Sequence, residues 1–289
     1  MSSSVTLGNA SYGFREYGLL EFFEASRQIG ITEVEIDAGW LVGEAQNAIT
    51  VDASQEEIQR VRDLADEVGV RVAALGSGAA VSLEGEVATD LSADIKQVID
   101  LADALDARVI RVFTEHDFTH SQHYTLPPER VSDALYETLA SAFNAIGEHA
   151  SQKNVRVAIE NHGGTSATGA KLKKLLDMVL HDSVGVTYDP ANFAYGGEDP
   201  YQALLAVKDR ILYTHWKDVA RSDGKVEYRA FGEGDIDWSP VIRTLLDEFQ
   251  GIWAIEYERK IDSTLETLME GTRMSINNLQ GVIDRVQKG

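Results

Sequence analysis

The segment VRVAIENH, residues 155–162, decides the fold of this chain. A short run rich in β-branched and small apolar residues ends at Glu160, and polar residues follow at once. Such a run, bounded by polar residues, predicts a buried strand that stops where the charge begins. Three later segments repeat the pattern: VGVTYDPAN (184–192), ILYTHWKD (211–218) and IWAIEYE (252–258). The second half of the chain therefore predicts four buried strands with polar residues at their carboxyl ends.

Short β-rich runs alternate with longer amphipathic runs along the rest of the chain. The expected strands are residues 5–8, 32–37, 70–75, 109–113, 155–160, 184–188, 211–215 and 252–257. The expected helices are residues 17–29, 54–68, 88–105, 127–152, 167–180, 200–207, 238–248 and 263–286. This alternation predicts a parallel sheet covered by helices, and eight units favour closure into a (β/α)8 TIM barrel. No linker-like stretch divides the chain, so we expect a single TIM-barrel domain over residues 1–289.

Two helix starts carry capping signals. Ser54 precedes one expected helix and Glu57 follows three residues later, which is the spacing of a capping box. Asp237 stands directly before the helix that is expected to begin at Trp238, at the end of the glycine-rich segment FGEGDIDW (231–238). We expect both Ser54 and Asp237 to accept hydrogen bonds from the first free backbone N–H groups of these helices.

Length and composition agree with one barrel and exclude several functions. About 250 residues is typical of an α/β barrel, and this chain has 289 residues, of which 44% are hydrophobic. The absence of cysteine excludes disulfides, thiolate metal sites and a cysteine nucleophile. A net charge of −21 would repel phosphate backbones, so nucleic acid is not an expected partner. The acidic excess is typical either of ordinary solubility or of adaptation to high salt.

The start of the chain, MSSSVTL, lacks the basic and apolar regions of a signal peptide. No apolar run reaches the length of about 18 residues that a transmembrane helix needs. We therefore expect a cytoplasmic protein with no membrane partner.

Four consecutive predicted strands end in metal-ligand side chains: Glu160, Asp189, His215 and Glu256. In barrels of this type the carboxyl ends of the strands form one rim, where the chemistry takes place. Three carboxylates that face one another repel, and a divalent cation removes that repulsion. The oxygen majority favours Mn²⁺ or Mg²⁺, while Co²⁺ and Zn²⁺ also suit such a ligand set. The alternative is that these acids form ion pairs or cap the following helices.

As a set, the segments quoted above, together with GLLEFFEASRQIGITEVEI (18–36), resemble the xylose isomerase-like TIM barrel superfamily. This superfamily includes ketose 3-epimerases, inosose dehydratases and isomerases, and the endonuclease IV nucleases. The resemblance implies one divalent metal ion held by Glu160, Asp189, His215 and Glu256. It also implies that Glu160 and Glu256 act as the acid/base pair on either side of the substrate carbon. Homo-oligomers are common in these families, so one is possible here.

The resemblance also implies a set of substrate contacts. Arg221 lies six residues after His215, at the offset of a substrate-contacting arginine in the epimerases, and Lys217 resembles the inosose-processing members. Asn192 stands where many epimerases have a histidine, which departs from the tagatose and psicose epimerases. His162, two residues past Glu160, is expected to face the same side as that ligand by strand alternation. Trp40, after the second strand, is expected either to form an apolar wall of the pocket or simply to pack against neighbouring side chains.

The function that these observations favour is isomerase or epimerase chemistry on a non-phosphorylated sugar or cyclitol, such as a ketose or an inosose. Proton abstraction next to a metal-bound carbonyl would begin the reaction. The alternative is a lyase that dehydrates a keto-sugar, a keto-cyclitol or a dehydroshikimate-like acid, because it starts with the same step. An endonuclease IV-like phosphodiesterase is disfavoured by Asn192 and by the lack of an Asp-x-His pair at residues 227–229. A non-catalytic barrel would be expected to lose part of the ligand set.

Overall fold

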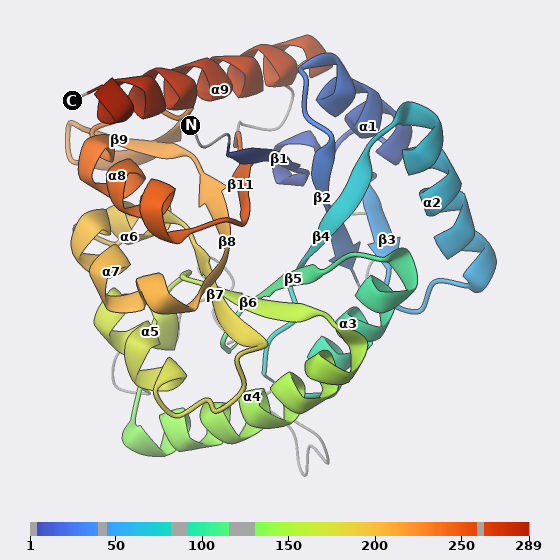
Figure 1. Cartoon of the computed structure of the whole chain (residues 1–289), viewed down its shortest axis with the longest axis vertical. Coiled ribbons are helices and arrows are strands. Elements are labelled where there is room, and N and C mark those ends of the chain that lie inside the picture. The colour runs from blue at the N-terminus through green and yellow to red at the C-terminus, as the bar shows by residue number, and fades with distance from the viewer. Residues whose placement is uncertain (1–4, 40–44, 82–91, 116–130, 259–262, 289) are drawn as a thin grey trace.

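The computed structural model describes residues 5–39, 45–81, 92–115, 131–258 and 263–288. Eight parallel strands form a closed barrel in these residues (Figure 1). Closure occurs at β1, which pairs in parallel with both β2 and β11. The strands are β1 (Thr6–Ala10), β2 (Glu33–Gly39), β4 (Arg71–Ser77), β5 (Val109–Val112), β6 (Arg156–Glu160), β7 (Val184–Tyr188), β8 (Ile211–Trp216) and β11 (Ile252–Ile255). The predicted (β/α)8 TIM barrel is confirmed.

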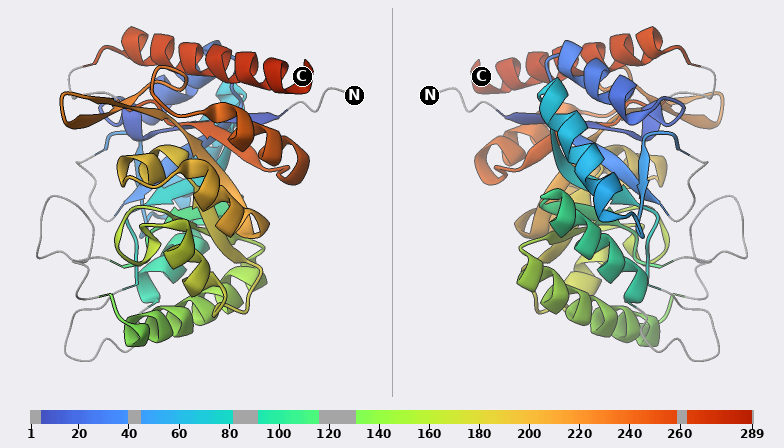
Figure 2. Two further views of the ribbon diagram at one scale, coloured as in Figure 1. Left: turned by 90° about the vertical axis from the view of Figure 1, so that its left-hand side faces the viewer. Right: turned by 90° about the vertical axis from the view of Figure 1, so that its right-hand side faces the viewer.

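Helices surround this barrel in both side views (Figure 2). The long helices are α1 (Leu19–Gln28), α2 (Gln55–Val68), α3 (Ala93–Leu105), α4 (Asp133–Lys153), α5 (Gly169–Leu176), α7 (Pro200–Val207), α8 (Trp238–Glu248) and α9 (Leu265–Lys288). Both predicted caps are present. Ser54 and Glu57 exchange the two hydrogen bonds of a capping box at α2, and the Asp237 side chain accepts from the Ser239 N–H at α8.

Three small additions to the barrel were not predicted. A short strand, β3 (Ala48–Thr50), pairs with β2, and a six-residue helix, α6 (Pro190–Tyr195), follows β7. The long connection after β8 folds into an antiparallel hairpin of β9 (Asp218–Ser222) and β10 (Lys225–Arg229). Its turn is Asp223-Gly224, with both residues at positive φ. An Asp-Gly pair is a strong hairpin signal, and β10 (KVEYR) alternates polar residues with Val226 and Tyr228, so the sequence does carry a hairpin pattern here.

Alternate residues of the barrel strands face opposite sides. On β2, Val34 and Ile36 belong to the large apolar core that the strands share with the helices. A second, smaller apolar cluster contains Tyr213 on β8 together with Ala158 and Ala254, which alternate along β6 and β11 with members of the large core. Because strand neighbours point to opposite faces, this small cluster lies inside the barrel. Two residues further along, these strands or the residues just after them carry Glu160, His215 and Glu256. The small apolar cluster therefore lies directly beneath these three side chains.

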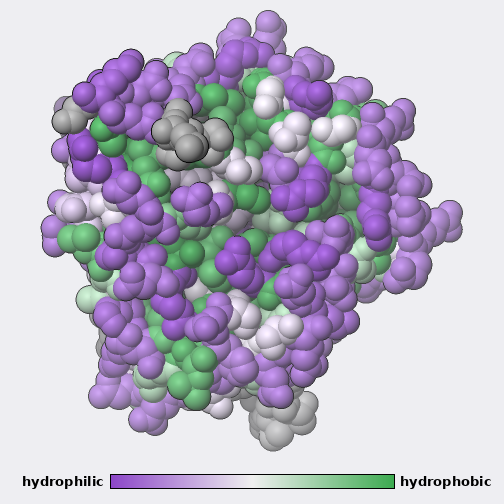
Figure 3. Space-filling model, viewed as in Figure 1, coloured by the Kyte–Doolittle hydropathy of each residue, from purple (hydrophilic) through white to green (hydrophobic). Residues whose placement is uncertain are grey.

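The face of the molecule shown in Figure 3 is hydrophilic around its periphery. Hydrophilic side chains cover most of the outer helices in Figure 3, and apolar side chains gather toward the middle of the visible face. Among the described residues, no helix is long and apolar enough to cross a membrane.

Candidate metal centre

The four predicted metal ligands converge at one end of the barrel. Glu160 is the last residue of β6, Asp189 follows β7, His215 lies in β8 and Glu256 follows β11. Each offers one ligand atom, and these atoms all lie within 4.8 Å of one another. All four side chains are buried. The structure therefore brings three carboxylates and an imidazole from four neighbouring strands to a single point.

His215 stands at the centre of this cluster, and its two ring nitrogens have different surroundings. The Nδ1 atom lies 3.3 Å from Glu160 Oε1 and 3.3 Å from Glu256 Oε2. The Nε2 atom lies 2.7 Å from Glu35 Oε2, on the far side of the ring. Burial lowers the pKa of His215, but Glu256 and Glu35 outweigh it and raise the pKa well above its usual value. The distances show that Nδ1 is the ring nitrogen that faces the other predicted ligands.

A buried arginine compensates part of the negative charge. The Arg111 side chain, on β5, places Nε 3.5 Å from Glu160 Oε2 and 3.6 Å from Glu35 Oε1. Its Nη1 donates to the Ser77 carbonyl at 3.1 Å. Burial raises the pKa of Glu160, yet Arg111 and His215 together lower it to about 2. Glu160 is therefore an ionised acceptor throughout the physiological pH range.

A second buried cation, Lys217, lies on the other side of the cluster. Its Nζ is 2.9 Å from Asp189 Oδ2, 2.5 Å from Glu256 Oε2 and 2.5 Å from Glu258 Oε1. Burial lowers the pKa of Lys217, but Asp189 and Glu256 outweigh it and raise the pKa well above its usual value. For Glu256, burial is outweighed by His215 and Lys217, so its pKa falls well below the usual value. Lys217 is therefore a cation held inside the predicted ligand set.

Asp189 has two roles at once. Its Oδ1 accepts from the Asn192 N–H at 3.1 Å and so caps α6, which is the role that the alternative interpretation of this residue predicts. Its Oδ2 is buried, accepts no hydrogen bond and faces Lys217. Burial, opposed by Lys217, raises the pKa of Asp189 to about 6. Three buried carboxylates and an imidazole, whose ligand atoms lie within 4.8 Å of one another, fit a divalent cation.

The other predicted site residues have different surroundings. Asn192 donates from Nδ2 to Glu160 Oε1 at 3.3 Å and accepts from the Tyr228 hydroxyl at 2.8 Å. The half-buried His162 ring contacts Phe113 edge to face, with ring centroids 5.2 Å apart. Arg221 is exposed on β9, and its guanidinium donates to the Ala194 carbonyl rather than to the cluster. Trp40 lies outside the described residues.

Sequence reasoning missed three polar residues around the cluster: Glu35, Arg111 and Tyr228. Arg111 is the single charged residue of the apolar strand β5, and this pattern could have identified it, whereas Glu35 shares β2 with Glu33 and Asp37. Tyr228 reaches Asn192 from the hairpin, which the Asp-Gly turn could have indicated. Its ring also lies 4.8 Å from Lys217 Nζ.

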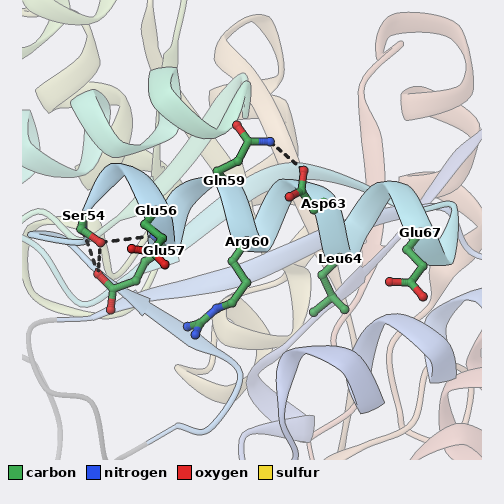
Figure 4. Close-up of a pocket in the computed structure, with 8 residues that line it drawn as sticks. All are labelled: Ser54, Glu56, Glu57, Gln59, Arg60, Asp63, Leu64 and Glu67. Atoms are coloured by element: carbon green, nitrogen blue, oxygen red, sulfur yellow. Dashed lines mark hydrogen bonds between the residues drawn. The ribbon is translucent and has the colours of Figure 1, made fainter.

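A hollow on the outside of the barrel differs in character from the buried cluster of predicted ligands. It runs along α2 and is lined by Ser54, Glu56, Glu57, Gln59, Arg60, Asp63, Leu64 and Glu67 (Figure 4). These side chains follow one another along the helix instead of converging. Gln59 donates to Asp63 at 2.7 Å, and most of the set is exposed. This surface is a solvated helix face and carries no chemistry comparable to the barrel cluster.

Comparisons with known proteins agree with this geometry. A family model described as xylose isomerase-like TIM barrel matches residues 23–278. An inosose dehydratase from Clostridium tetani (strain Massachusetts / E88) is 30% identical over 141 residues, which are 43% of this chain and 47% of the relative. The chain spans about half the length of the curated relatives it matches.

Two solved structures show the same fold. A crystal structure of D-psicose 3-epimerase in the presence of D-fructose superposes with a TM-score of 0.75 and 16% identity, covering 96% of this chain and 99% of the other. A xylose isomerase-like TIM barrel protein from Mycobacterium smegmatis, in complex with magnesium, superposes with a TM-score of 0.73 and 15% identity. The match covers 98% of this chain and 99% of the other. At these identities the likeness concerns the fold alone.

Proposed function

Because the chain belongs to the xylose isomerase-like TIM barrel family, we propose that it is a divalent-metal-dependent lyase. Its substrate would be a non-phosphorylated polyhydroxy carbonyl compound, such as an inosose or another keto-cyclitol or keto-sugar, from which it removes water. The similarity to inosose dehydratases supports this choice of reaction over the isomerase that the sequence slightly favours. A substrate without phosphate is supported by the site, where Arg111 and Lys217 are both engaged by carboxylates.

The residues that would hold the metal are Glu160, Asp189, His215 and Glu256, whose ligand atoms lie within 4.8 Å of one another. With three carboxylates and one imidazole, Mn²⁺ or Mg²⁺ suits the set best. Such an ion polarises a carbonyl group and stabilises the negative charge that develops when a neighbouring C–H bond loses its proton.

The observation that carries the lyase proposal is the buried ammonium of Lys217 among these carboxylates. Water loss needs a base for the proton next to the carbonyl and an acid for the departing hydroxyl. Glu256 or Glu160, both ionised, would take the proton from carbon. The C–O bond on the next carbon would then break, and Lys217 would give a proton to the leaving oxygen. Epimerisation needs no such acid, because no group leaves.

The second candidate function is isomerisation or epimerisation. It is favoured by two carboxylates from different strands, since Glu160 and Glu256 both lie 3.3 Å from His215 Nδ1. One of them could remove the proton from one face of the substrate carbon, and the other could return a proton to the opposite face. In this case Lys217 would only bind a substrate oxygen.

Incubation of the Mn²⁺-loaded protein with inososes, ketoses and 3-keto sugars in D₂O tests the proposal. Mass spectrometry and NMR distinguish the products: a lyase lowers the substrate mass by one water, whereas an isomerase keeps the skeleton and introduces deuterium at one carbon. If no member of the panel exchanges or loses a proton, both candidate functions are wrong for these substrate classes.

Lys217→Met separates the two functions more sharply. Removal of the acid should slow water loss by about 10²–10⁴-fold and leave deuterium exchange next to the carbonyl nearly unchanged. The matched control is Lys225→Met, because Lys225 is an exposed lysine on β10. Equal loss of exchange and of dehydration in Lys217→Met would contradict the proposed role of Lys217.

A further inference from the structure

Below the predicted ligands lies a second set of buried polar side chains, which we call the lower layer: Glu35 on β2, Arg111 on β5 and Tyr213 on β8. The Arg111 Nε lies 3.6 Å from Glu35 Oε1. Burial and the nearby Glu35 carboxylate raise the pKa of Tyr213 well above its usual value. None of these residues is among the four predicted ligands, yet two of them, Glu35 and Tyr213, contact His215.

The lower layer contacts the predicted ligand His215 at one ring nitrogen, Nε2. Glu35 Oε2 lies 2.7 Å from His215 Nε2, whereas Nδ1 faces Glu160 and Glu256 at 3.3 Å. A neutral imidazole carries one N–H donor and one acceptor lone pair, and the partner of one nitrogen decides the state of the other. A carboxylate can only accept, so in the neutral ring that would bind a metal Glu35 selects the form with hydrogen on Nε2. The lone pair is then on Nδ1, directed at the other ligands.

Glu35 is itself held rigidly. It is almost fully buried, and Arg111 and Tyr213 contact it from two other strands. The register between β2 and β4 shifts between Val34 and Glu35, and such irregularities commonly re-aim a side chain next to a functional site. A Cβ atom at Gly76 would lie 2.7 Å from Arg111 Nη2 and closer still to the Glu35 carboxylate. The absence of a side chain at this position is what leaves room for the pair.

We infer that Glu35 is a positioning residue that fixes the tautomer and the orientation of His215, so that Nδ1 is the metal ligand, and thereby sets the metal affinity. This inference rests on the proposed metal binding of the cluster. Hydrogen-bonding partners of metal-ligating histidines typically change metal affinity by about 10–100-fold when they are removed. Glu35 would touch neither the metal nor the substrate, so its effect should appear in binding before any reaction takes place.

The first test needs no mutation. Nitrogen-15 NMR of the wild-type protein loaded with Mg²⁺ or Zn²⁺ reports which His215 nitrogen carries hydrogen. We expect a protonated Nε2 and a metal-bound Nδ1. A protonated Nδ1, or a metal bound through Nε2, overturns the inference whatever the variants show.

The second test compares Glu35→Gln with Asp37→Asn by calorimetric titration with Mn²⁺. Both changes remove one negative charge from the inner face of β2, but Asp37 contacts Arg111 and Ser11 and not His215. We expect about 10–100-fold weaker binding for Glu35→Gln and less than about threefold for Asp37→Asn. An equal loss of affinity in both variants would mean that only the removed charge matters. Unchanged Mn²⁺ binding in Glu35→Gln would refute the inferred role of Glu35 and leave the proposed metal site intact. If the wild-type chain binds no metal at the cluster, both the proposed function and the inferred role of Glu35 fail.

Discussion

Gly76→Ala should destabilise the protein by crowding the lower layer. Gly76 lies on β4 at a conformation that alanine can adopt, since its φ is not among the positive values. The added Cβ would lie 2.7 Å from Arg111 Nη2 and 3.2 Å from Asp37 Oδ1, and it would overlap the Glu35 carboxylate. Contacts below 3.0 Å are essentially never made by real Cβ atoms. At least one of the charged side chains must therefore move.

The expected magnitude follows from what that movement breaks. Arg111 is held by its bond to the Ser77 carbonyl and Glu35 by its bond to His215. A hydrogen bond to a charged group contributes about 1.5–3 kcal/mol, and overpacking of a core costs about 1–3 kcal/mol. Against this, alanine is favoured over glycine by about 0.5–1 kcal/mol in a strand. We expect a net loss of about 1–3 kcal/mol in the free energy of unfolding, with weaker metal binding.

Urea unfolding followed by tryptophan fluorescence, with chelator present, measures this loss. The matched control is Gly78→Ala, two residues further along, where an added Cβ meets no atom within 4 Å. The control should leave stability unchanged or raise it by up to about 1 kcal/mol. If Gly76→Ala behaves like its control and binds Mn²⁺ as tightly as wild type, the lower layer is not as tightly packed as we infer.

Three further predictions concern the rest of the molecule. Burial, opposed by Arg111, raises the pKa of Asp37 from 3.8 to about 6, so the native state binds a proton that the unfolded chain releases and stability falls as the pH rises through this window. Asp37→Asn should therefore match wild type at pH 4 and be up to about 3 kcal/mol more stable at pH 8 in urea unfolding; an advantage independent of pH contradicts this. Asp237→Ala should lose about 1 kcal/mol through the missing cap of α8, while Asp237→Asn should lose little; equal melting temperatures would exclude the cap. Because the net charge is −21, 1 M KCl should raise the melting temperature by screening repulsion, and an unchanged value would remove that expectation.

The fold and the four converging ligands could be predicted because they depend on the simplest regularity of the chain. Each of the four strands β6, β7, β8 and β11 is an apolar run with a predicted ligand at its carboxyl end, and parallel strands place such ends at one rim. The lower layer was missed for the same physical reason. On β2, Glu35 and Asp37 alternate with Val34 and Ile36, which is the pattern of a strand with one face in water. Only closure of the barrel turns that polar face inward.

Directions of side chains outside the barrel strands could not be predicted from spacing. Arg221 has the offset of a substrate-contacting arginine, but it lies on the hairpin strand β9, where its guanidinium turns to the Ala194 carbonyl. Asn192 lies beside Glu160 because α6 begins directly after Asp189, and that short helix had no apolar repeat of its own to indicate it. The role of Trp40 and the organisation of the chain as one domain stay predictions.

Anomalous diffraction from a crystal soaked in Mn²⁺ tests the central claim most directly. We predict one strong peak among the carboxylate oxygens of Glu160, Asp189 and Glu256 and the Nδ1 atom of His215, at roughly 2.0–2.2 Å from each ligand atom. A peak only on the acidic outer face of α2, or none inside the barrel, would contradict the account.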